Sequence, residues 1–323
     1  HANFAGSSKH GGVIALMGDD HTAESSTTAH QSEFHFVDVM MPILNPAGVQ
    51  EIIDYGLYGF AMSRFTGAWA ALKCMHETVE STAVVDGALD RVKIIIPDDF
   101  AMPPGGLNIR LQDTILGQEA RLHDFKRDAM LAFVRANKLN RTIFSGGRNP
   151  KIGVITTGKS YLDVRQALDD LGIDEVKAAR LGIRLLKVGM VWPLEESVIR
   201  DFARGLSTVM VVEEKRSLIE AQLRDILYAE PSRPAVIGKQ DEEGRSLFAP
   251  HGVLEPNQIA FAIAARIHDR ATSDCASALQ DGTTARNQAG LVARIPYFCA
   301  GCPHNSSTVL PDGARGYAGI GCH

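Results

Sequence analysis

Between residues 151 and 230 the sequence alternates short apolar runs with amphipathic segments, and this alternation limits the possible folds more than any other feature. The apolar runs cover residues 152–155, 183–188 and 208–212, and segments with helical periodicity cover residues 160–171 and 218–227. Continuous apolar runs are typical of strands whose two faces are both covered in a parallel sheet. The sequence therefore predicts an α/β fold with parallel sheets flanked by helices.

The first 150 residues also contain strand and helix patterns. Residues 11–17 form an apolar run that ends in Gly-Asp, which is typical of a buried strand followed by a loop. We expect a helix over residues 49–71, a strand over residues 92–96 and a helix over residues 119–136.

After residue 230 the pattern weakens. Residues 231–255 contain prolines and a polar run and predict a linker, residues 257–269 predict a short helix, and residues 270–290 predict a mobile connection. A new unit begins at Ile295. We therefore divide the chain into the segments 1–150, 151–238, 239–293 and 294–323.

Composition excludes several classes of protein. A net charge of −5 argues against a nucleic-acid groove or a site for an anionic membrane surface. No apolar run reaches about 18 residues, so no membrane-spanning helix is expected, and the first residues lack the pattern of a secretory leader. Three of the five cysteines lie in residues 299–322, which fits a reducing compartment and metal or catalytic use better than a disulfide framework. We expect a cytoplasmic protein.

The two ends of the chain predict a piece of a longer protein. The chain begins with His1 in a Gly- and Ser-rich segment, and it stops at His323 directly after an apolar run of strand character. Natural termini are usually polar and frayed. We expect the remaining domains of the same protein to complete any site near these ends.

Gly153 to Ser160 match the G-x-x-x-x-G-K-S pattern of a phosphate-binding loop letter for letter. Such a loop needs its strand before the first glycine, whereas Gly153 lies inside the predicted strand. The segment between the two glycines is Val-Ile-Thr-Thr, which is stiff because all four of its residues are β-branched. We therefore favour a plain strand-to-helix turn and keep a P-loop nucleotide-binding module as the alternative.

A polar loop, residues 18–31, follows the strand predicted at residues 11–17 and is dense in hydrogen-bonding groups. Ligands of open α/β sheets bind beyond the carboxyl ends of strands. Asp19, His21 and His30 are possible metal ligands, but no helical i, i+4 spacing orients them. A ligand-lining loop is therefore favoured over a metal site or a plain solvated loop.

The last motif is Cys299-x-x-Cys302, which is followed by Cys322. A four-thiolate zinc or iron–sulfur site needs one more cysteine. Cys275 is a candidate, but its Ala- and Ser-rich surroundings favour a fourth ligand in sequence beyond His323. A zinc-binding interaction domain and buried or incidental thiols remain alternatives.

Taken in order, these motifs resemble the 2-oxoacid:ferredoxin oxidoreductases, and in particular the indolepyruvate ferredoxin oxidoreductase branch in its long fused bacterial form. Residues 298–304 and 319–322 are similar to the start of that family's diphosphate-binding thiamine domain. The Gly-Asp-Asp of residues 18–20 resembles the loop that closes its pyrimidine-binding domain. Residues 151–230 are similar to the transketolase C-terminal-like domain between the two, and only residues 240–290 or so lie outside the resemblance.

The resemblance implies an identity for each segment. Residues 1–150 would be the C-terminal part of the pyrimidine-binding thiamine domain with a connecting segment. Residues 151–238 would be the three-layer transketolase C-terminal-like domain, and residues 239–293 a linker with a short helix. Residues 294–323 would be the truncated start of the diphosphate-binding thiamine domain.

The resemblance also implies an activity, namely ferredoxin-linked oxidative decarboxylation of an aryl 2-oxo acid such as indolepyruvate, or of a branched-chain 2-oxo acid, to acyl-CoA and CO₂. The implied cofactors are thiamine diphosphate, Mg²⁺ and [4Fe-4S] clusters, with the cofactors performing the organic and redox chemistry. Ferredoxin would accept the electrons and coenzyme A the acyl group. A homo-oligomer is expected, and neither nucleic acid nor membrane is an expected partner.

Carried over residue by residue, the resemblance makes Cys299, Cys302 and Cys322 iron–sulfur ligands that lack a fourth partner. It makes His304 a catalytic residue that faces the cofactor diphosphate or the substrate. The residues that would line the substrate and cofactor are Asp19, Asp20, Ser25, Ser26, Gln31, Gly319 and Gly321. The glutamate that activates the aminopyrimidine would precede His1 and the magnesium motif would follow His323, so we expect the chain alone to be inactive.

Overall fold

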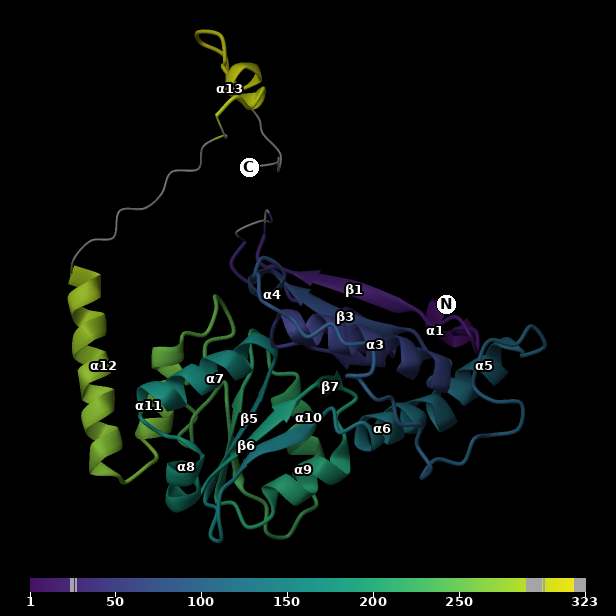
Figure 1. Cartoon of the computed structure of the whole chain (residues 1–323), viewed down its shortest axis with the longest axis horizontal. Coiled ribbons are helices and arrows are strands. Elements are labelled where there is room, and N and C mark those ends of the chain that lie inside the picture. Colours follow the sequence, from purple (N-terminus) through teal and green to yellow (C-terminus); the bar gives the residue numbers. More distant parts are fainter. Residues whose placement is uncertain (24–25, 27, 289–297, 299, 317–323) are drawn as a thin grey trace.

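The computed structural model describes residues 1–23, 26, 28–288, 298 and 300–316, and most of these residues form two adjoining α/β layers (Figure 1). The first layer contains a four-stranded sheet in the order β1-β3-β2-β7. Its strands are β1 (Ile14–Asp19), β3 (Ala70–Met75), β2 (Ile43–Leu44) and β7 (Met190–Trp192). Only β7 runs antiparallel to its neighbour within this sheet.

The second layer contains a five-stranded sheet in the order β4-β6-β5-β8-β9. Its strands are β4 (Arg141–Ser145), β6 (Ile183–Val188), β5 (Ile152–Thr157), β8 (Thr208–Val212) and β9 (Ala235–Ile237). The four strands from β6 to β9 pair in parallel, and β4 adds an antiparallel edge.

Most of the helices pack against the two sheets. The helices before β5 are α1 (Ala2–Ala5), α2 (Glu33–Asp38), α3 (Val49–Thr66), α4 (His76–Val79), α5 (Ile115–Arg121), the π-helix η1 (Leu122–Lys126) and α6 (Arg127–Ala136). Those after β5 are α7 (Gly158–Asp170), α8 (Glu175–Leu181), α9 (Glu196–Ala203), α10 (Ile219–Leu227), α11 (Pro256–Ala264), α12 (Arg270–Gln288) and α13 (His304–Ser307). Within the described residues, no helix is both long and apolar enough to cross a membrane.

Three apolar clusters hold these layers together. One joins α3 and α6 to the four-stranded sheet, and a second joins α7, α8 and α11 to the five-stranded sheet. The third lies under α9 and α10, and it includes Met17, Ile43 and Ala71 from the four-stranded sheet. Because one apolar core contains residues of both sheets, their carboxyl ends are fixed relative to each other.

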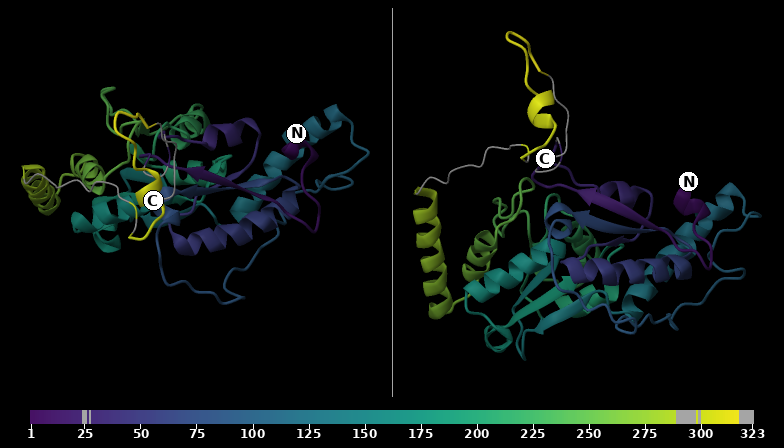
Figure 2. Two further views of the ribbon diagram at one scale, coloured as in Figure 1. Left: turned by 90° about the horizontal axis from the view of Figure 1, so that it is seen from above. Right: turned by 45° about the horizontal axis from the view of Figure 1, so that its top comes forward.

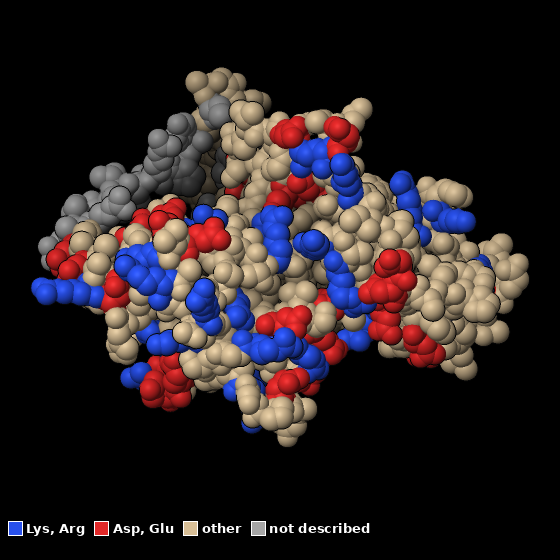
Figure 3. Space-filling view, turned by 60° about the horizontal axis from the view of Figure 1, so that its bottom comes forward, with Lys and Arg blue, Asp and Glu red and all other residues tan. Residues whose placement is uncertain are grey.

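The surface carries charges of both signs. In Figure 3, basic and acidic side chains are interspersed over the face that is shown. Among the described residues, many charged side chains form ion pairs, such as Arg200–Glu196 and Arg204–Asp201. A mixed surface of this kind is typical of globular protein.

The strands and helices predicted between residues 151 and 230 are confirmed. Strands β6 and β8 have the predicted bounds, β5 extends two residues further, and α7 and α10 match the predicted helices to within two residues. These elements were predictable because their apolar runs are buried on both faces. The predicted helix over residues 119–136 is also confirmed, and it includes the π-helix η1 between α5 and α6.

Residues 92–96 are not the predicted strand. Ile94, Ile95 and Ile96 are 37%, 53% and 60% exposed, so this apolar run is not covered on two faces. The Asn137 side chain accepts a hydrogen bond from Ile95 N and donates one to Ile95 O, both at 2.8 Å. One side-chain amide thus takes the place that a neighbouring strand would have.

Three other boundaries differ from the prediction. The helix expected over residues 49–71 ends at Thr66, where Gly67 adopts a left-handed conformation (φ 66°), and β3 begins at Ala70. The linker expected over residues 231–255 contributes the edge strand β9. Residues 270–288, which were expected to form a mobile connection, form α12, and Cys275 and Leu279 of this helix pack against the core.

The division of the chain into four segments remains a proposal. Sheet pairing does not follow the segment boundary at residue 150, because β4 precedes it and pairs with β6. In the same way β7 comes from the second segment but pairs with β2 in the four-stranded sheet. Each sheet therefore contains one strand from the other side of the boundary at residue 150.

Candidate functional site

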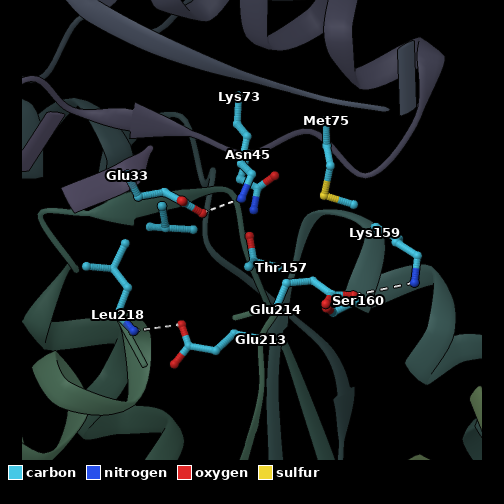
Figure 4. Close-up of a pocket in the computed structure, with 11 residues that line it drawn as sticks. Glu33, Asn45, Lys73, Met75, Thr157, Lys159, Ser160, Glu213, Glu214 and Leu218 are labelled. Carbon is cyan, nitrogen blue, oxygen red and sulfur yellow. Dashed lines mark hydrogen bonds and ion pairs between the residues drawn. The ribbon is translucent and has the colours of Figure 1, made fainter. Parts of the chain in front are cut away.

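The carboxyl ends of both sheets meet around a small polar cavity (Figure 4). Lys73 comes from β3, Asn45 follows β2, Thr157 ends β5, and Glu213 and Glu214 follow β8. The cavity has a volume of about 20 Å³, which is the space of one water molecule or one small ion. The sheet ends on which ligands bind in α/β proteins are thus brought together here from two sheets.

Lys73 is the centre of a buried ionic cluster on the side of the four-stranded sheet. Its Nζ lies 3.3 Å from Asp19 Oδ2 and 3.3 Å from His21 Nε2, and it donates a hydrogen bond to Glu33 Oε1. The side chain of Lys73 is only 2% exposed. Burial acts to lower the pKa of Lys73, but the Glu33 and Asp19 carboxylates raise it above its ordinary value. Lys73 is therefore a permanent cation.

His21 is buried beside this cation. Burial and the Lys73 ammonium together lower the pKa of His21 to about 3. The ring is therefore uncharged at neutral pH, and its Nε2 accepts a hydrogen bond from the Lys73 ammonium group. Its Nδ1 is buried and has no hydrogen-bond partner among the described residues.

Two of the predicted lining residues, Asp19 and Asp20, accept hydrogen bonds from backbone groups in and next to their own loop, residues 18–31. Asp19 Oδ1 accepts a hydrogen bond from Ser32 N at 3.0 Å and lies 3.1 Å from His30 Nδ1. Asp20 Oδ2 accepts a hydrogen bond from Ser26 N at 2.8 Å. Burial acts to raise the pKa of Asp19, but Lys73 and Ser32 lower it below its ordinary value. Both carboxylates are buried and support the loop.

Two residues after β8 hold the same loop from the side of the five-stranded sheet. Lys215 has a left-handed backbone (φ 57°), and its Nζ donates a hydrogen bond to the carbonyl oxygen of His21. Arg216 donates from N and Nε to Gln31 Oε1 at 3.2 and 3.3 Å, and its guanidinium lies 4.0 Å from the centre of the Phe34 ring. Gln31, a predicted lining residue, is thus fixed by the other layer.

Glu213 and Glu214 have structural partners at the far side of the cavity. The Glu213 carboxylate accepts hydrogen bonds from the backbone N–H groups of residues 218–220 at 2.8 to 3.0 Å, at the first turn of α10. Burial raises the pKa of Glu213 to about 7, despite these hydrogen bonds. Glu214 accepts a hydrogen bond from Leu254 N at 3.2 Å, and burial raises its pKa.

The alternative of a phosphate-binding loop is wrong. Gly153 lies inside β5, where a Cβ would overlap the side chains of Phe202 and Leu206. Lys159 Nζ is engaged by Asp163 Oδ2 at 2.8 Å, Glu214 Oε1 at 3.4 Å and Leu254 O at 3.0 Å. With these three contacts its donors are used within the protein, so Lys159 is not available to a phosphate.

The predicted cysteine and histidine site is only partly described. Cys302 is half-buried, and His304 is exposed with its Nδ1 3.4 Å from Ser307 Oγ and its ring 5.3 Å from that of Phe298. Helix α13, which contains His304, stands clear of both sheets in Figures 1 and 2. The site role of His304 therefore stays a prediction.

Several predicted residues lie outside the described part of the chain. They are Ser25, Cys299, Gly319, Gly321 and Cys322. Within the described part, no group of three or more His, Cys, Asp or Glu residues is arranged to hold a metal ion. The iron–sulfur ligands therefore remain a prediction.

The most central residues of the cavity were missed by reasoning from the sequence. Lys73 carried a signal, because it is the single charged residue in the apolar run Ala-Ala-Leu-Lys-Cys-Met. Its strand was assigned in part to the preceding helix, which hid that signal. Glu33 and Asn45 carried none, since a glutamate after a serine and an asparagine before a proline fit ordinary helix starts.

Comparison with known proteins connects this geometry to a family. Residues 142–289 match a family described as "Indolepyruvate oxidoreductase domain". The protein named Indolepyruvate oxidoreductase subunit IorA from Methanothermobacter marburgensis is 23% identical over 301 residues, which are 91% of this chain and 44% of the relative. Its namesake from Archaeoglobus fulgidus is 24% identical over 314 residues, which are 94% of this chain and 45% of the relative. The chain thus spans about half the length of the curated relatives it matches.

A solved structure shows the same fold. The 2-oxoglutarate:ferredoxin oxidoreductase from Magnetococcus marinus superimposes with a TM-score of 0.51 at 16% identity, over 77% of this chain and 48% of that one. In fold the chain is similar to a 2-oxoacid:ferredoxin oxidoreductase. In sequence it is similar to the indolepyruvate oxidoreductases, which its motifs resemble.

Proposed function

We propose that the protein containing this chain carries out ferredoxin-linked oxidative decarboxylation of 2-oxo acids, to acyl-CoA and CO₂. Indolepyruvate and related aryl 2-oxo acids are the favoured substrates, with branched-chain 2-oxo acids next. The observation that carries the proposal is the similarity to IorA subunits over more than nine-tenths of the chain. A further support is that the superimposed solved structure holds 2-oxoglutarate, coenzyme A and succinyl-CoA.

Thiamine diphosphate would bind on the outer side of the loop of residues 18–31. The cavity beneath that loop, at about 20 Å³, is far too small for it. On the outer side, Ser25, Ser26 and Gln31 would line the site, while Asp19 and Asp20 keep the loop in place from below. When bound, thiamine diphosphate supplies the electron sink for decarboxylation, with Mg²⁺ on its diphosphate.

Cys299, Cys302 and Cys322 would ligate a [4Fe-4S] cluster together with a fourth cysteine from the rest of the protein. His304 would face the cofactor diphosphate or the substrate, and Gly319 and Gly321 would allow the backbone to approach it closely. In support, Cys302 has a free thiol among the described residues and is half-buried.

The proposed setting follows from the same family. Ferredoxin would receive the electrons, coenzyme A and a 2-oxo acid would be the substrates, and the remaining domains would complete the thiamine site, in a cytoplasmic homo-oligomer without nucleic acid or membrane. The mixed charges seen in Figure 3 favour a protein that does not bind nucleic acid. The relatives are named as subunits. That this chain belongs to a long fused protein is therefore also part of the proposal.

The test uses the complete protein that contains this chain, purified without oxygen. With thiamine diphosphate, Mg²⁺ and coenzyme A present, we expect indolepyruvate to drive reduction of ferredoxin faster than pyruvate or 2-oxoglutarate does. Omission of thiamine diphosphate should abolish the reaction. Absence of thiamine-dependent turnover with every 2-oxo acid would refute the proposal.

Two matched cysteine variants test the proposed cluster. Cys302→Ser should lower the iron and sulfide content of the purified protein and its ferredoxin reduction. Cys275→Ser is the control, because Cys275 packs against the core of the five-stranded sheet through α12. Equal iron content in the two variants would remove Cys302 from the ligand set.

A further inference from the structure

We propose that the groove between helix α9 and the edge strand β4 binds a small molecule that carries a phosphate group. Lys138, Arg141 and Arg184 line this groove, together with the hydroxyl groups of Thr142 and Ser145. Its volume of about 560 Å³ lies within the range of small-molecule sites. The groove shares no lining residue with the cavity at Lys73, and the proposal does not rest on the oxidoreductase activity.

The walls of the groove are held in place by the rest of the fold. Strand β4 pairs with β6, and Phe202 of α9 belongs to the apolar core that joins the two sheets. Asn140, which also lines the groove, accepts hydrogen bonds from Gly189 N at 2.9 Å and from Met190 N at 3.1 Å. The groove therefore lies beside the two connections through which the chain passes from one sheet to the other.

Arg184 is a fixed, half-buried cation. Its Nε donates a hydrogen bond to Ser145 O at 3.1 Å, and its Nη1 donates to the carbonyl oxygens of Phe202 and Arg204. These contacts use three of the five guanidinium N–H groups and leave the two on Nη2. Burial lowers the pKa of Arg184, but a guanidinium group keeps its charge at neutral pH. Among the described residues, no carboxylate forms an ion pair with it.

The groove has more positive than negative charge. Arg141 is 57% exposed and lies 3.5 Å from Glu51, and Lys138 is exposed without an ion pair in the described part of the chain. The carboxylate that lines the groove, Asp201, pairs with Arg204 at 2.9 Å. Even with Glu51 assigned in full to Arg141, two cations of the groove have no counter-ion. This local excess stands in a protein whose net charge is −5.

These groups match a phosphate ester. Its oxygens only accept hydrogen bonds, and the groups available to it are donors, namely Nη2 of Arg184, the Lys138 ammonium group and two exposed hydroxyl groups. Paired N–H groups of arginine fit phosphate oxygens, and a dianion would neutralise the two unpaired cations. The groove is larger than one phosphate, so it has room for the remainder of the ligand.

A peptide that adds a strand to β4 is the weaker alternative. Strand addition needs a regular edge, whereas β4 has a register shift between Thr142 and Phe144. Charged side chains such as Arg141 also discourage pairing at a sheet edge. The geometry of β4 thus favours a small anion over an extended acidic peptide.

The test is isothermal titration calorimetry of the complete protein, without added cofactors and at constant ionic strength. AMP is the probe, and adenosine is its matched counterpart without the phosphate. We expect AMP to bind with a saturating curve, adenosine not to bind, and inorganic phosphate to compete with AMP. AMP should also raise the melting temperature, because a ligand that binds only the native state stabilises it.

Matched variants locate the binding site. Lys138→Asn removes the ammonium group and suits the left-handed backbone at this position (φ 49°). Arg184→Lys keeps the charge but loses the planar pair of N–H groups. Each should weaken AMP binding by about tenfold, the effect of one charge-assisted hydrogen bond. Lys9→Asn, at an exposed lysine that does not line the groove, is the control and should bind AMP as the unaltered protein does.

Three outcomes would overturn the proposal. The first is the absence of saturable binding of both AMP and inorganic phosphate. The second is AMP binding that Lys138→Asn and Arg184→Lys leave unchanged while urea unfolding shows both variants folded, which would put the ligand elsewhere. The third is displacement of AMP by polyglutamate of higher affinity, which would make the groove a surface for an acidic peptide. None of these measurements uses turnover, so failure of the oxidoreductase assay would leave the result standing.

Discussion

Lys73 Nζ lies 3.3 Å from Asp19 Oδ2, and this contact joins the carboxyl ends of two neighbouring parallel strands. The two side chains are 2% and 0% exposed, so neither charge is screened by water. Glu33, at the start of α2, contacts the same ammonium group. The cluster therefore fixes the point at which the loop of residues 18–31 leaves the four-stranded sheet.

The first prediction concerns this ion pair. Lys73→Met should destabilise the protein by about 3–5 kcal/mol, because removal of one partner leaves Asp19 and Glu33 as buried carboxylates without compensation. Urea unfolding measures the loss as a lower midpoint at an unchanged slope.

A double variant and a surface control make this test specific. Adding Glu33→Gln to Lys73→Met removes one of the stranded charges and should recover part of the lost stability, a non-additivity expected for residues in contact. Lys93→Met, at an exposed lysine, should change stability by less than about 0.5 kcal/mol. Additive losses in the double variant would show that the two side chains do not interact.

The second prediction concerns Arg216. Arg216→Ala removes the hydrogen bond from Nε to Gln31 and the contact with the Phe34 ring, but it keeps the bond from the backbone N. It should cost about 1–2 kcal/mol of local stability. Hydrogen exchange should show this as faster exchange of the amides in residues 28–34. In the complete enzyme, KM for the 2-oxo acid should rise more than kcat falls, because the loop is loosened but the chemistry is not changed.

Arg204→Ala is the control for Arg216→Ala, since Arg204 forms an exposed ion pair with Asp201. Arg216→Lys should restore the charge but not the planar contact with Phe34. If exchange in residues 28–34 stays unchanged in Arg216→Ala, the second layer does not hold the loop.

The fold could be predicted where burial is two-sided. Strands β5, β6 and β8 are covered on both faces, so their apolar runs identify them without any knowledge of their neighbours. The error at residues 92–96 has the opposite cause, because three isoleucines in a row look like a buried strand but are exposed here. The edge strand β9 was missed because a sheet edge needs only three residues and carries little pattern.

The candidate site could be predicted only in part. The loop after β1 could be found, because polar residues beyond the end of a buried strand are a local pattern. The partners of that loop could not, since Lys73 is 54 residues from Asp19 and Lys215 is 194 residues from His21. Contacts between layers depend on how two sheets pack, and no local periodicity encodes that.

The third prediction concerns the pH dependence of stability. The pKa of His21 is about 3 in the folded protein, lowered from 6.5 by burial and by Lys73. The unfolded chain therefore binds one more proton than the folded chain between these two pH values, so stability from His21 is complete above pH 6.5 and is lost as the pH falls toward 3. The contribution of this residue is about 1.4 kcal/mol per pH unit in that window.

His21→Gln should reduce that slope, because glutamine can accept from Lys73 but does not titrate. Urea unfolding at several pH values from 7 down to about 4.5 measures the difference in slope between the variant and the unaltered protein. His10→Gln, at an exposed histidine, is the control and should leave the slope as it is. Parallel curves for His21→Gln and the unaltered protein would contradict the prediction.

The fourth prediction concerns Gly158, where β5 passes into α7. Gly158 has a left-handed backbone (φ 52°), and a Cβ at this position would overlap the Asn45 amide at the cavity. Gly172 at the other end of α7 is also left-handed (φ 61°), but a Cβ there would meet no atom within 4 Å. Gly172→Ala should therefore cost only the backbone strain of about 1–2 kcal/mol, whereas Gly158→Ala should cost about 1–3 kcal/mol more. Urea unfolding measures the two losses as lower midpoints at an unchanged slope. Equal costs for the two glycines would mean that the Asn45 amide does not occupy the space beside Gly158.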